Sequence, residues 1–325
     1  MTKRRVILVA LLVIFVVSLA LLPAVVKKDS TINLAILVLL YVTLASSWNI
    51  LGGYAGQTNL GHAAFFGLGT LVARHLWLSG TPLFASLLAG GSVAVAFALL
   101  IGIPAFKLRG AYFAIGTLAL AQILHVTVGN EFPTITSLPA QLLATYQLLP
   151  RYYLFLILAL LTIGTVYLLV NSRLGLGIMA VREEEDAAES LGVSALRRKL
   201  LALGVSAFLA GLAGGAFAYY HVSYYPQFPF GPVWTFDAVM MTYIGGTGTL
   251  IGPIIGAVFY VVVKELLALK LVELHLTVFG ILFILVVLFL PGGFVEAWAK
   301  IQRAVARRSR QKGRTLTRKE RELPA

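Results

Sequence analysis

Apolar runs about as long as a bilayer is thick recur along the chain, and they limit its fold more than any other feature. About twenty apolar residues in a helix cross the hydrocarbon core of a membrane, and such runs begin at Val6, Thr31, Leu83, Tyr152 and Leu200. With 59% hydrophobic residues among 325 and only 12% charged, the composition lies far from that of soluble domains. The sequence therefore predicts an all-α, polytopic helical bundle in a membrane.

The glycine-rich stretch from Gly52 to Gly69 predicts an interrupted helix. Gln57, Asn59 and His62 lie among its glycines, and polar groups at membrane depth are tolerated inside a bundle or along a cavity. We expect Asn59 to cap a helix that begins near Leu60, with the N-terminus of that helix facing a translocation path. Close packing of helices through small residues is the alternative explanation for the glycines, but it explains the polar side chains less well.

The direction of the chain predicts a second break, at Gly245 to Pro253. A single crossing between Phe236 and Lys264 would turn the final helix, His275 to Leu290, outward and leave the basic C-terminal tail outside the cell. Basic residues collect on the cytoplasmic side of membrane proteins. The break therefore divides this region into two shorter elements, which brings the expected number of membrane elements to about 8–10, some of them broken or re-entrant.

One charged stretch, residues 171–199, interrupts the apolar pattern. Apolar residues recur in it at helical spacing between acids and bases, which predicts one or two short amphipathic helices outside the bilayer. A turn between two helices needs only about two to eight residues, so the segment is long enough to be a docking surface for a soluble partner. A solvated surface loop is the alternative that charge alone leaves open.

Basic residues mark both ends of the chain. The run from Lys3 to Arg5 precedes the first apolar run, and ten of the 26 basic residues follow Glu296. This predicts a transmembrane domain over residues 1–295 and a basic tail over 296–325, with both termini cytoplasmic. The tail suits anionic lipid better than nucleic acid. We expect the first apolar run to be a retained helix, since it is too long for a typical signal peptide and lacks a small-residue cleavage site.

Several classes of protein are excluded by residue types that are missing. The chain contains no cysteine, so disulfides, thiolate metal sites and cysteine catalysis are excluded. Its five histidines are scattered, which argues against a metal centre, and no cofactor is expected. No Gly-x-x-x-x-Gly-Lys-Ser/Thr loop occurs, so the chain does not bind ATP as a P-loop protein does. No pattern of catalytic side chains supports an enzyme.

The charged stretch resembles part of a known family. Residues 186–192, Asp-Ala-Ala-Glu-Ser-Leu-Gly, resemble the Glu-Ala-Ala-x-x-x-Gly loop of ABC importer permeases, with aspartate in place of the leading glutamate. In that family the loop forms a short helix that inserts into a groove on the ATP-hydrolysing subunit. The resemblance implies that this chain is coupled to an ATPase through the cytoplasmic stretch and, within it, through Arg173, Gly175, Arg182, Glu183, Asp186, Ala187, Ala188 and Gly192.

Four segments in order resemble the branched-chain amino acid permease family of ABC importers: residues 52–69, 108–123, 173–192 with the helix that follows, and 244–257. The resemblance implies two cytoplasmic ATPases, an extracytoplasmic solute-binding protein, and a second, different permease of the same family. The path would lie at the interface of the two permeases. The residues that we expect along it are Gln57, Asn59, His62, Tyr112, Thr117, Gln122, Gly245 and Gly246.

Branched-chain or related hydrophobic amino acids are the solutes that the resemblance implies. Some members of the family carry urea, short amides or aromatic acids, and these stay open as alternatives. A secondary transporter driven by protons or sodium is the rival from another class, and it usually has a buried carboxylate near the membrane midplane. Asp237, Glu265 and Glu273 are the acids nearest the apolar runs, and all are expected toward the ends of helices.

Overall fold

The computed structural model describes residues 3–26, 28–270 and 292–300, and the separate residues 278, 280, 281, 284, 285, 288 and 302. The predicted final helix, His275 to Leu290, lies mostly outside the described residues, as does the basic tail. Most of the described chain is helical, and its two short strands, β1 (Thr136–Ser137) and β2 (Ser223–Tyr224), pair with each other in antiparallel orientation. The prediction of an all-α bundle is confirmed.

Long helices account for most of the described chain. Among the described residues, five segments are long and apolar enough to cross a membrane: α2 with its extension η1, α4, α5, α7 and α10. The structure is therefore that of a polytopic membrane protein, as the apolar runs predict. The bounds of the long helices are α1 (Lys3–Val25), α2 (Asp29–Asn49), α3 (His62–Leu78), α4 (Leu83–Ala105), α5 (Ala111–Glu131), α7 (Leu148–Val170), α10 (Ala195–Tyr220), α11 (Pro232–Gly245) and α12 (Gly252–Lys270).

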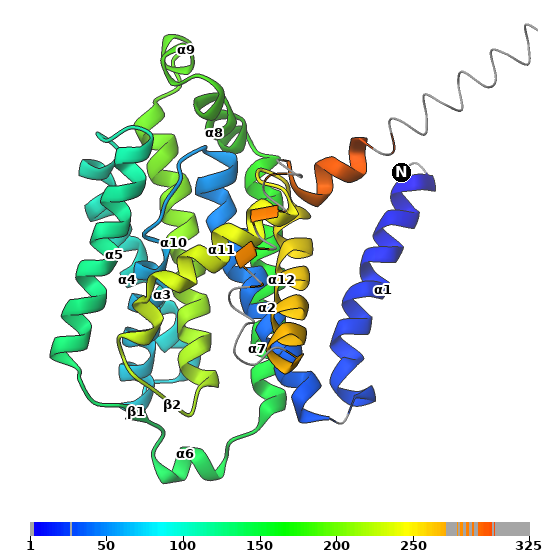
Figure 1. The fold of residues 1–325 in the computed structure, drawn as a ribbon, viewed down its shortest axis with the longest axis vertical. Coiled ribbons are helices and arrows are strands. Elements are labelled where there is room, and N and C mark those ends of the chain that lie inside the picture. Colours follow the sequence, from blue (N-terminus) through cyan, green and yellow to red (C-terminus); the bar gives the residue numbers. More distant parts are fainter. Residues whose placement is uncertain are drawn as a thin grey trace, which may run out of the picture.

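The short elements gather at the two ends of the bundle. Figure 1 shows α8 (Arg173–Glu183) and α9 (Glu185–Ser190) at one end, where α1 also begins, and α6 (Ala140–Ala144), β1 and β2 at the other. None of the residues of α6 is buried, so it lies on the surface of the bundle. The end with α8 and α9 and the end with α6, β1 and β2 are therefore expected to face water on opposite sides of the membrane.

Small residues let α10 approach α3 and α4 closely at the centre of the bundle. A Cβ at Gly214 of α10 would overlap the carbonyl oxygen of Phe66 on α3, and a Cβ at Gly69 would overlap the carbonyl oxygen of Gly211. Backbones in membranes approach this closely only where side chains are small. The small residues of α10 and α3 therefore allow the tight contact between these two helices.

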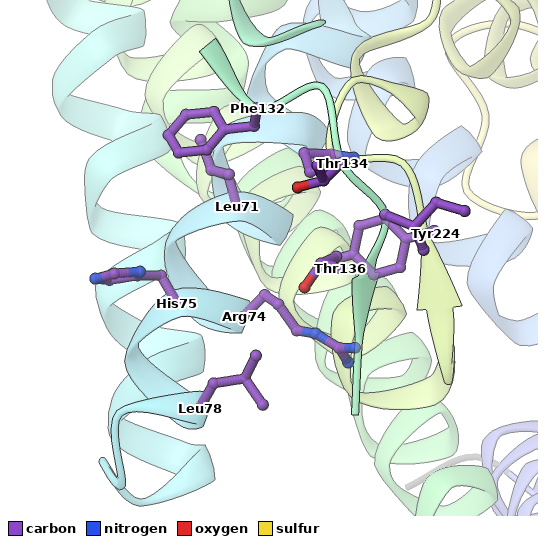
Figure 2. A pocket seen from close by; sticks show the side chains of 10 residues that line it. Leu71, Arg74, His75, Leu78, Phe132, Thr134, Thr136 and Tyr224 are labelled. Atoms are coloured by element: carbon purple, nitrogen blue, oxygen red, sulfur yellow. The ribbon is translucent and has the colours of Figure 1, made fainter. Parts of the chain in front are cut away.

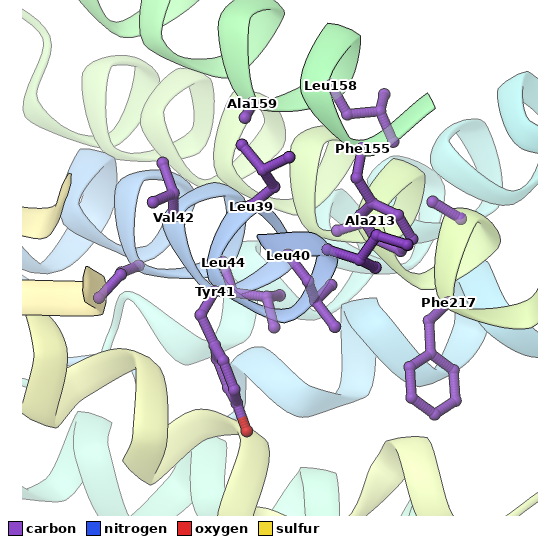
Figure 3. Close-up of a cluster of buried hydrophobic side chains, with 14 of the residues drawn as sticks. Leu39, Leu40, Tyr41, Val42, Leu44, Phe155, Leu158, Ala159, Ala213 and Phe217 are labelled. Carbon is purple, nitrogen blue, oxygen red and sulfur yellow. The ribbon is translucent and has the colours of Figure 1, made fainter. Parts of the chain in front are cut away.

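The helix α2 is the second buried helix, and the largest apolar cluster surrounds it. Leu40 and Leu44 are 1% exposed and pack in one cluster with Phe155 of α7 and Phe217 of α10. Figure 3 shows these side chains around α2, whereas the phenol oxygen of Tyr41 points away from them. Close packing is the main force that holds helices together in lipid, so this cluster fixes α2 against its neighbours.

Both predicted helix breaks are present. At the first, α2 continues into a π-helical turn, η1 (Ile50–Tyr54), and α3 begins only at His62. The expectation that Asn59 caps this helix is wrong, because Gly61 occupies the cap position and Asn59 Oδ1 instead accepts the Gly61 N–H at 2.8 Å within a local turn. At the second, α11 ends at Gly245 and α12 begins at Gly252.

Candidate functional site

The charged stretch folds as the two short helices that its pattern predicts, α8 and α9. The hydroxyl of Ser172 caps α8 by accepting the N–H of Gly175 at 3.2 Å. A Cβ at Gly175 would overlap the carbonyl oxygen of Leu169, so only glycine allows the sharp turn from α7 into α8. Arg173 and Glu183 are exposed. Figure 1 shows α9 at the extreme end of the bundle, beyond the ends of the long helices.

One face of α9 is held against its own chain. Glu185 Oε2 lies 2.5 Å from Nζ of Lys199 at the start of α10. Ala188 is 4% exposed and packs with Val181 of α8 and Ala195 of α10. Ala188 therefore packs α9 against its own chain, whereas the neighbouring alanine, Ala187, is exposed.

The rest of α9 and the residue after it are open to solvent. Leu191 follows the helix directly and is 85% exposed. Asp186 is also exposed, with one oxygen 3.9 Å from the guanidinium of Arg109 in the α4–α5 loop. Gly192 has a φ of 85°, a conformation that residues with side chains rarely adopt, and it turns the chain back toward α10. Sequence reasoning missed Leu191, because one leucine in an apolar chain is inconspicuous; its place inside the Ala-Ala-x-x-x-Gly pattern is the signal.

Asn49, at the end of α2, joins the two helix breaks. It is 1% exposed. Its Oδ1 accepts the N–H of Gly248 at 2.9 Å, and its Nδ2 donates to the carbonyl oxygen of Thr249 at 2.9 Å. A Cβ at Gly53 in η1 would overlap Asn49 and approach the backbone nitrogen of Gly248. The first break and the loop after α11 therefore lie directly against each other.

Arg182 on α8 lies across both breaks. A Cβ at Gly56 would lie 2.9 Å from Cγ of Arg182, and a Cβ at Gly248 would lie 2.6 Å from its Nη1. Both glycines have positive φ, 68° and 69°, which favours glycine on backbone grounds as well. The side chain of Arg182 thus connects α8 to the backbone of both interrupted helices.

If the chain carries solute for an ATPase, as the resemblance implies, replacing Arg182 with alanine should lower solute uptake by about tenfold, since residues that connect two sites change coupling by roughly 0.5–2 kcal/mol. The contact between α8 and the breaks would be lost, while the outward face of α9 would be unchanged. Uptake per molecule of ATP hydrolysed, measured in proteoliposomes, reports this loss. Arg197→Ala, which removes an exposed arginine at the same end of the bundle, is the control, and equal uptake by the two variants would show that the contact of Arg182 transmits nothing.

Three of the predicted path residues come together beside the first break. Asn59 and His62 are each 1% exposed, and Thr117 of α5 is 6% exposed. The Thr117 hydroxyl accepts the N–H of Leu60 at 3.1 Å, and His62 Nε2 lies 3.0 Å from Ser47 Oγ. The polar side chains that sequence reasoning selected here therefore hold the segment between η1 and α3 against α2 and α5.

The other predicted path residues lie elsewhere. Gln57 is partly buried in the first break, and Gly245 and Gly246 are buried in the second. Tyr112 is 75% exposed and Gln122 is also exposed, both on α5. In the part of the chain that the structure describes, Asn59 and Thr117 line one small cavity, but the eight predicted residues do not all share it.

A cavity of about 360 Å³ lies at the end of the bundle opposite α9. Figure 2 shows Arg74 of α3 and Tyr224 of β2 in its wall. Arg74 donates to the carbonyl oxygen of Ala218, in the last turn of α10, at 2.8 Å, where the helix leaves carbonyls without helical partners. It also donates to the carbonyl oxygen of Val222, two residues past the end of the helix, at 2.9 Å. Burial lowers the pKa of nearby His221 to about 4, so its ring is neutral at pH 7. Arg74 is thus a cap for α10.

A buried acid and a base form an ion pair between α11 and α12. Sequence reasoning did not predict this pair. Asp237 is 5% exposed in the second turn of α11, inside the helix rather than toward an end as expected. Lys264 of α12 places its Nζ 3.5 Å from Asp237 Oδ2. The signal was available, because each is an isolated charge in an apolar run and the predicted break makes the two runs antiparallel arms of one hairpin.

The comparisons with known proteins agree with this architecture. Residues 30–287 match the family described as branched-chain amino acid transport system / permease component. The chain is 28% identical to the high-affinity branched-chain amino acid transport system permease protein LivM of Escherichia coli, over 90% of this chain and 75% of that protein. It is 24% identical to a probable branched-chain amino acid transport permease protein LivM of Methanocaldococcus jannaschii, over 59% and 62%.

A further relative is the autoinducer 2 import system permease protein LsrC of Klebsiella pneumoniae, 33% identical over 46% of this chain and 45% of that protein. None of the solved structures matches the chain. The family match spans both helix breaks and the whole of α8 and α9. The chain therefore belongs to the family of permease components of branched-chain amino acid transport systems.

Proposed function

We propose that the chain forms one half of a path for branched-chain or related apolar amino acids, and that ATPases docked on α9 drive it. The chain itself is not an enzyme. Its family and the names of its LivM relatives, which are branched-chain amino acid permeases, support the solute class. The observation on which the docking depends most is the geometry of α9, which is fixed to the permease on one face and is otherwise open.

The exposed leucine supplies the contact. Leu191 stands at the end of the bundle without cover from the described residues, and Asp186 and Ala187 lie on the helix before it. An apolar side chain beside a small residue fits a groove on another protein, since aliphatic anchors bind in pockets at the centre of interfaces. Ala188 acts indirectly, by holding α9 at the angle at which Leu191 projects.

Movement of α9 has a direct route to the helix breaks. When the two ATPases close on each other, α9 moves with them, and α8 moves with α9. Arg182 contacts the backbone of both breaks, and Asn49 joins one break to the other. Rigid movement of these joined segments would change which side of the path is open.

The positions of basic residues support an orientation with α9 in the cytoplasm. Lys107 and Arg109 in the α4–α5 loop, Arg173 of α8, and Arg197 and Arg198 of α10 lie at the α9 end. Basic residues near helix ends favour the cytoplasmic side. The chain start lies at the same end (Figure 1). In this orientation both termini are cytoplasmic, and α6, β1 and β2 face the solute-binding protein in a bacterial inner membrane.

The outer helices offer a surface for the second permease, which is a different member of the same family in this proposal. In the apolar stretch of each helix, only 22% of the residues of α5 and 33% of those of α4 are buried within the chain. Tyr112 and Gln122 on α5 are exposed, so an interface there would place them on the path between the two permeases. Two ATPases and one binding protein complete the assembly.

Replacing Leu191 with aspartate is the test of docking. A carboxylate forced into an apolar groove costs several kcal/mol, so a loss of about 3 kcal/mol would weaken ATPase binding roughly a hundredfold. Co-purification of the ATPase with the permease pair and solute-stimulated ATP hydrolysis measure the effect.

Leu143→Asp is the matched control, because Leu143 is 48% exposed on α6 at the opposite end. It should leave ATPase binding unchanged. The docking proposal is wrong if the Leu191 variant retains its ATPase and its stimulated hydrolysis at the level of the Leu143 variant.

The buried carboxylate of Asp237 favours one second candidate, a transporter driven by an ion gradient, since such proteins place acids at membrane depth. The two candidates respond differently to energy supply. We expect uptake in proteoliposomes to require ATP and to survive an uncoupler. Uptake that continues without ATP and stops with the uncoupler would support the second candidate.

A further inference from the structure

The pair Asp237 and Lys264 opens on a cavity of about 350 Å³. Most of its wall is apolar, with Trp234, Phe228 and Val233 among the lining residues, and both members of the pair also line it. This size and this combination of apolar walls with a few polar groups are typical of sites for small molecules.

The pair lies deep in the membrane domain. Lys264 follows the start of α12 by twelve residues, which at about 1.5 Å per residue places it roughly 18 Å along the helix. The hydrocarbon core is about 30 Å thick. Figure 1 shows α11 at the middle height of the bundle, beside α12. Charged groups at this depth are expensive, and they usually mark the route of a solute or ion.

Two phenols hold the carboxylate in place independently of the lysine. Tyr41 of α2 donates to Asp237 Oδ2 at 2.9 Å, and Tyr260 of α12 donates to Oδ1. Lys264 Nζ lies 3.1 Å from the Tyr260 hydroxyl. The carboxylate is almost fully buried, whereas the lysine side chain is 34% exposed. The carboxylate is thus fixed, and the ammonium is free to change partners.

We propose that this cavity binds the zwitterionic head of an apolar α-amino acid, with the solute carboxylate on Lys264 and the solute ammonium on Asp237. The apolar side chain of the solute lies against Trp234 and Phe228. The site therefore gives a chemical basis to the solute class proposed above and depends on that proposal.

Charge balance favours the exchange of the Asp237–Lys264 ion pair for two ion pairs with the solute. The protein pair is neutral as a whole, and so is an amino acid zwitterion. When a zwitterion enters, each protein charge gains an opposite charge from the solute, and no unpaired charge is buried before or after the exchange. A solute with only one of the two charges leaves one of its own or one of the protein's charges without a partner, so the site discriminates against it.

Thiol labelling tests the site, because the chain has no cysteine of its own. Val233 lines the cavity and is 61% exposed, so Val233→Cys should react with a membrane-impermeant maleimide in the complete reconstituted complex. Val222→Cys, in the same outer segment but outside the cavity lining, is the control. Free leucine is added in excess without binding protein, so that protection cannot arise from a docked protein.

Leucine should protect Val233→Cys and leave Val222→Cys reactive. Isopentylamine is leucine without its carboxylate, and isocaproate is leucine without its ammonium. Each should protect Val233→Cys only at concentrations at least about tenfold higher than leucine, because each loses one charged hydrogen bond. In a Lys264→Met background leucine should be no better than isopentylamine, and Lys264→Arg should restore the difference. This loss of discrimination distinguishes binding from a merely structural ion pair.

Uptake by the same complexes separates the two proposals. For uptake, binding protein is added back to the complexes. If the Val222→Cys complex then takes up leucine with ATP, while leucine leaves the labelling of Val233→Cys unchanged, the cavity is not the site although the transport function stands. If Lys264→Met keeps the full preference for leucine, the ion pair is structural only. If the control complex takes up no apolar amino acid at all, the proposed function fails first.

Discussion

Replacing Asn49 with alanine is expected to abolish most uptake while the permease remains in the membrane. The change leaves the N–H of Gly248 and the carbonyl of Thr249 without their buried partner. Each such loss costs about 1–3 kcal/mol, so the contact between the two breaks weakens by about 2 kcal/mol or more. Because each transport cycle in the proposed function uses the contact between the two breaks, uptake in proteoliposomes should fall roughly thirtyfold or more.

Ser46 provides a matched control on the same helix. It is 3% exposed, like Asn49 it lies in the last turns of α2, and its hydroxyl has no hydrogen-bond partner among the described residues. Ser46→Ala should therefore leave uptake unchanged. Similar uptake by the Asn49 and Ser46 variants, at equal amounts of assembled complex, would contradict the role of Asn49.

Replacing Gly214 with alanine should destabilise the whole bundle. The new Cβ would overlap the carbonyl oxygen of Phe66 and press on the side chain and backbone of Thr70. Backbone cannot yield as a side chain does, so α10 and α3 must separate. Overpacking typically costs about 1–3 kcal/mol, and we expect the upper end of that range. A lower unfolding temperature in detergent and a lower yield of complex are the measurements.

Gly204 on the same helix separates this effect from helix propensity. The nearest atoms to a Cβ at Gly204 lie 4.0 Å away, on Leu99 and Val95. Gly204→Ala should therefore stabilise the helix slightly, since alanine is about 1 kcal/mol better than glycine in a helix. An unfolding temperature for Gly214→Ala that matches Gly204→Ala would show that the close approach of α3 and α10 is dispensable.

The long helices and their breaks were predictable from the sequence because both leave strong local signals. Apolar runs set the length of each span, and dense glycines mark the breaks. The hairpin of α11 and α12 followed from a physical rule about charge rather than from any local pattern, since only two elements between Phe236 and Lys264 agree with a cytoplasmic tail.

The faces of the short helices were not predictable, because six residues of α9 are too few to define an apolar stripe. Ala187 and Ala188 look equivalent in the sequence, yet one is exposed and the other is buried against Val181 and Ala195. The network around Asn49 was equally hidden. An asparagine at the end of an apolar run gives no sign of a partner 200 residues away.

That separation has a consequence for biosynthesis. A chain emerges from the ribosome from its N-terminus onward, at about 5–20 residues per second. Asn49 enters the membrane early, but the loop that satisfies its amide follows 200 residues later. The Asn49 amide must therefore wait for at least roughly ten seconds of synthesis at the faster rate before the loop can bond to it, and until then it depends on water or lipid headgroups for hydrogen bonds.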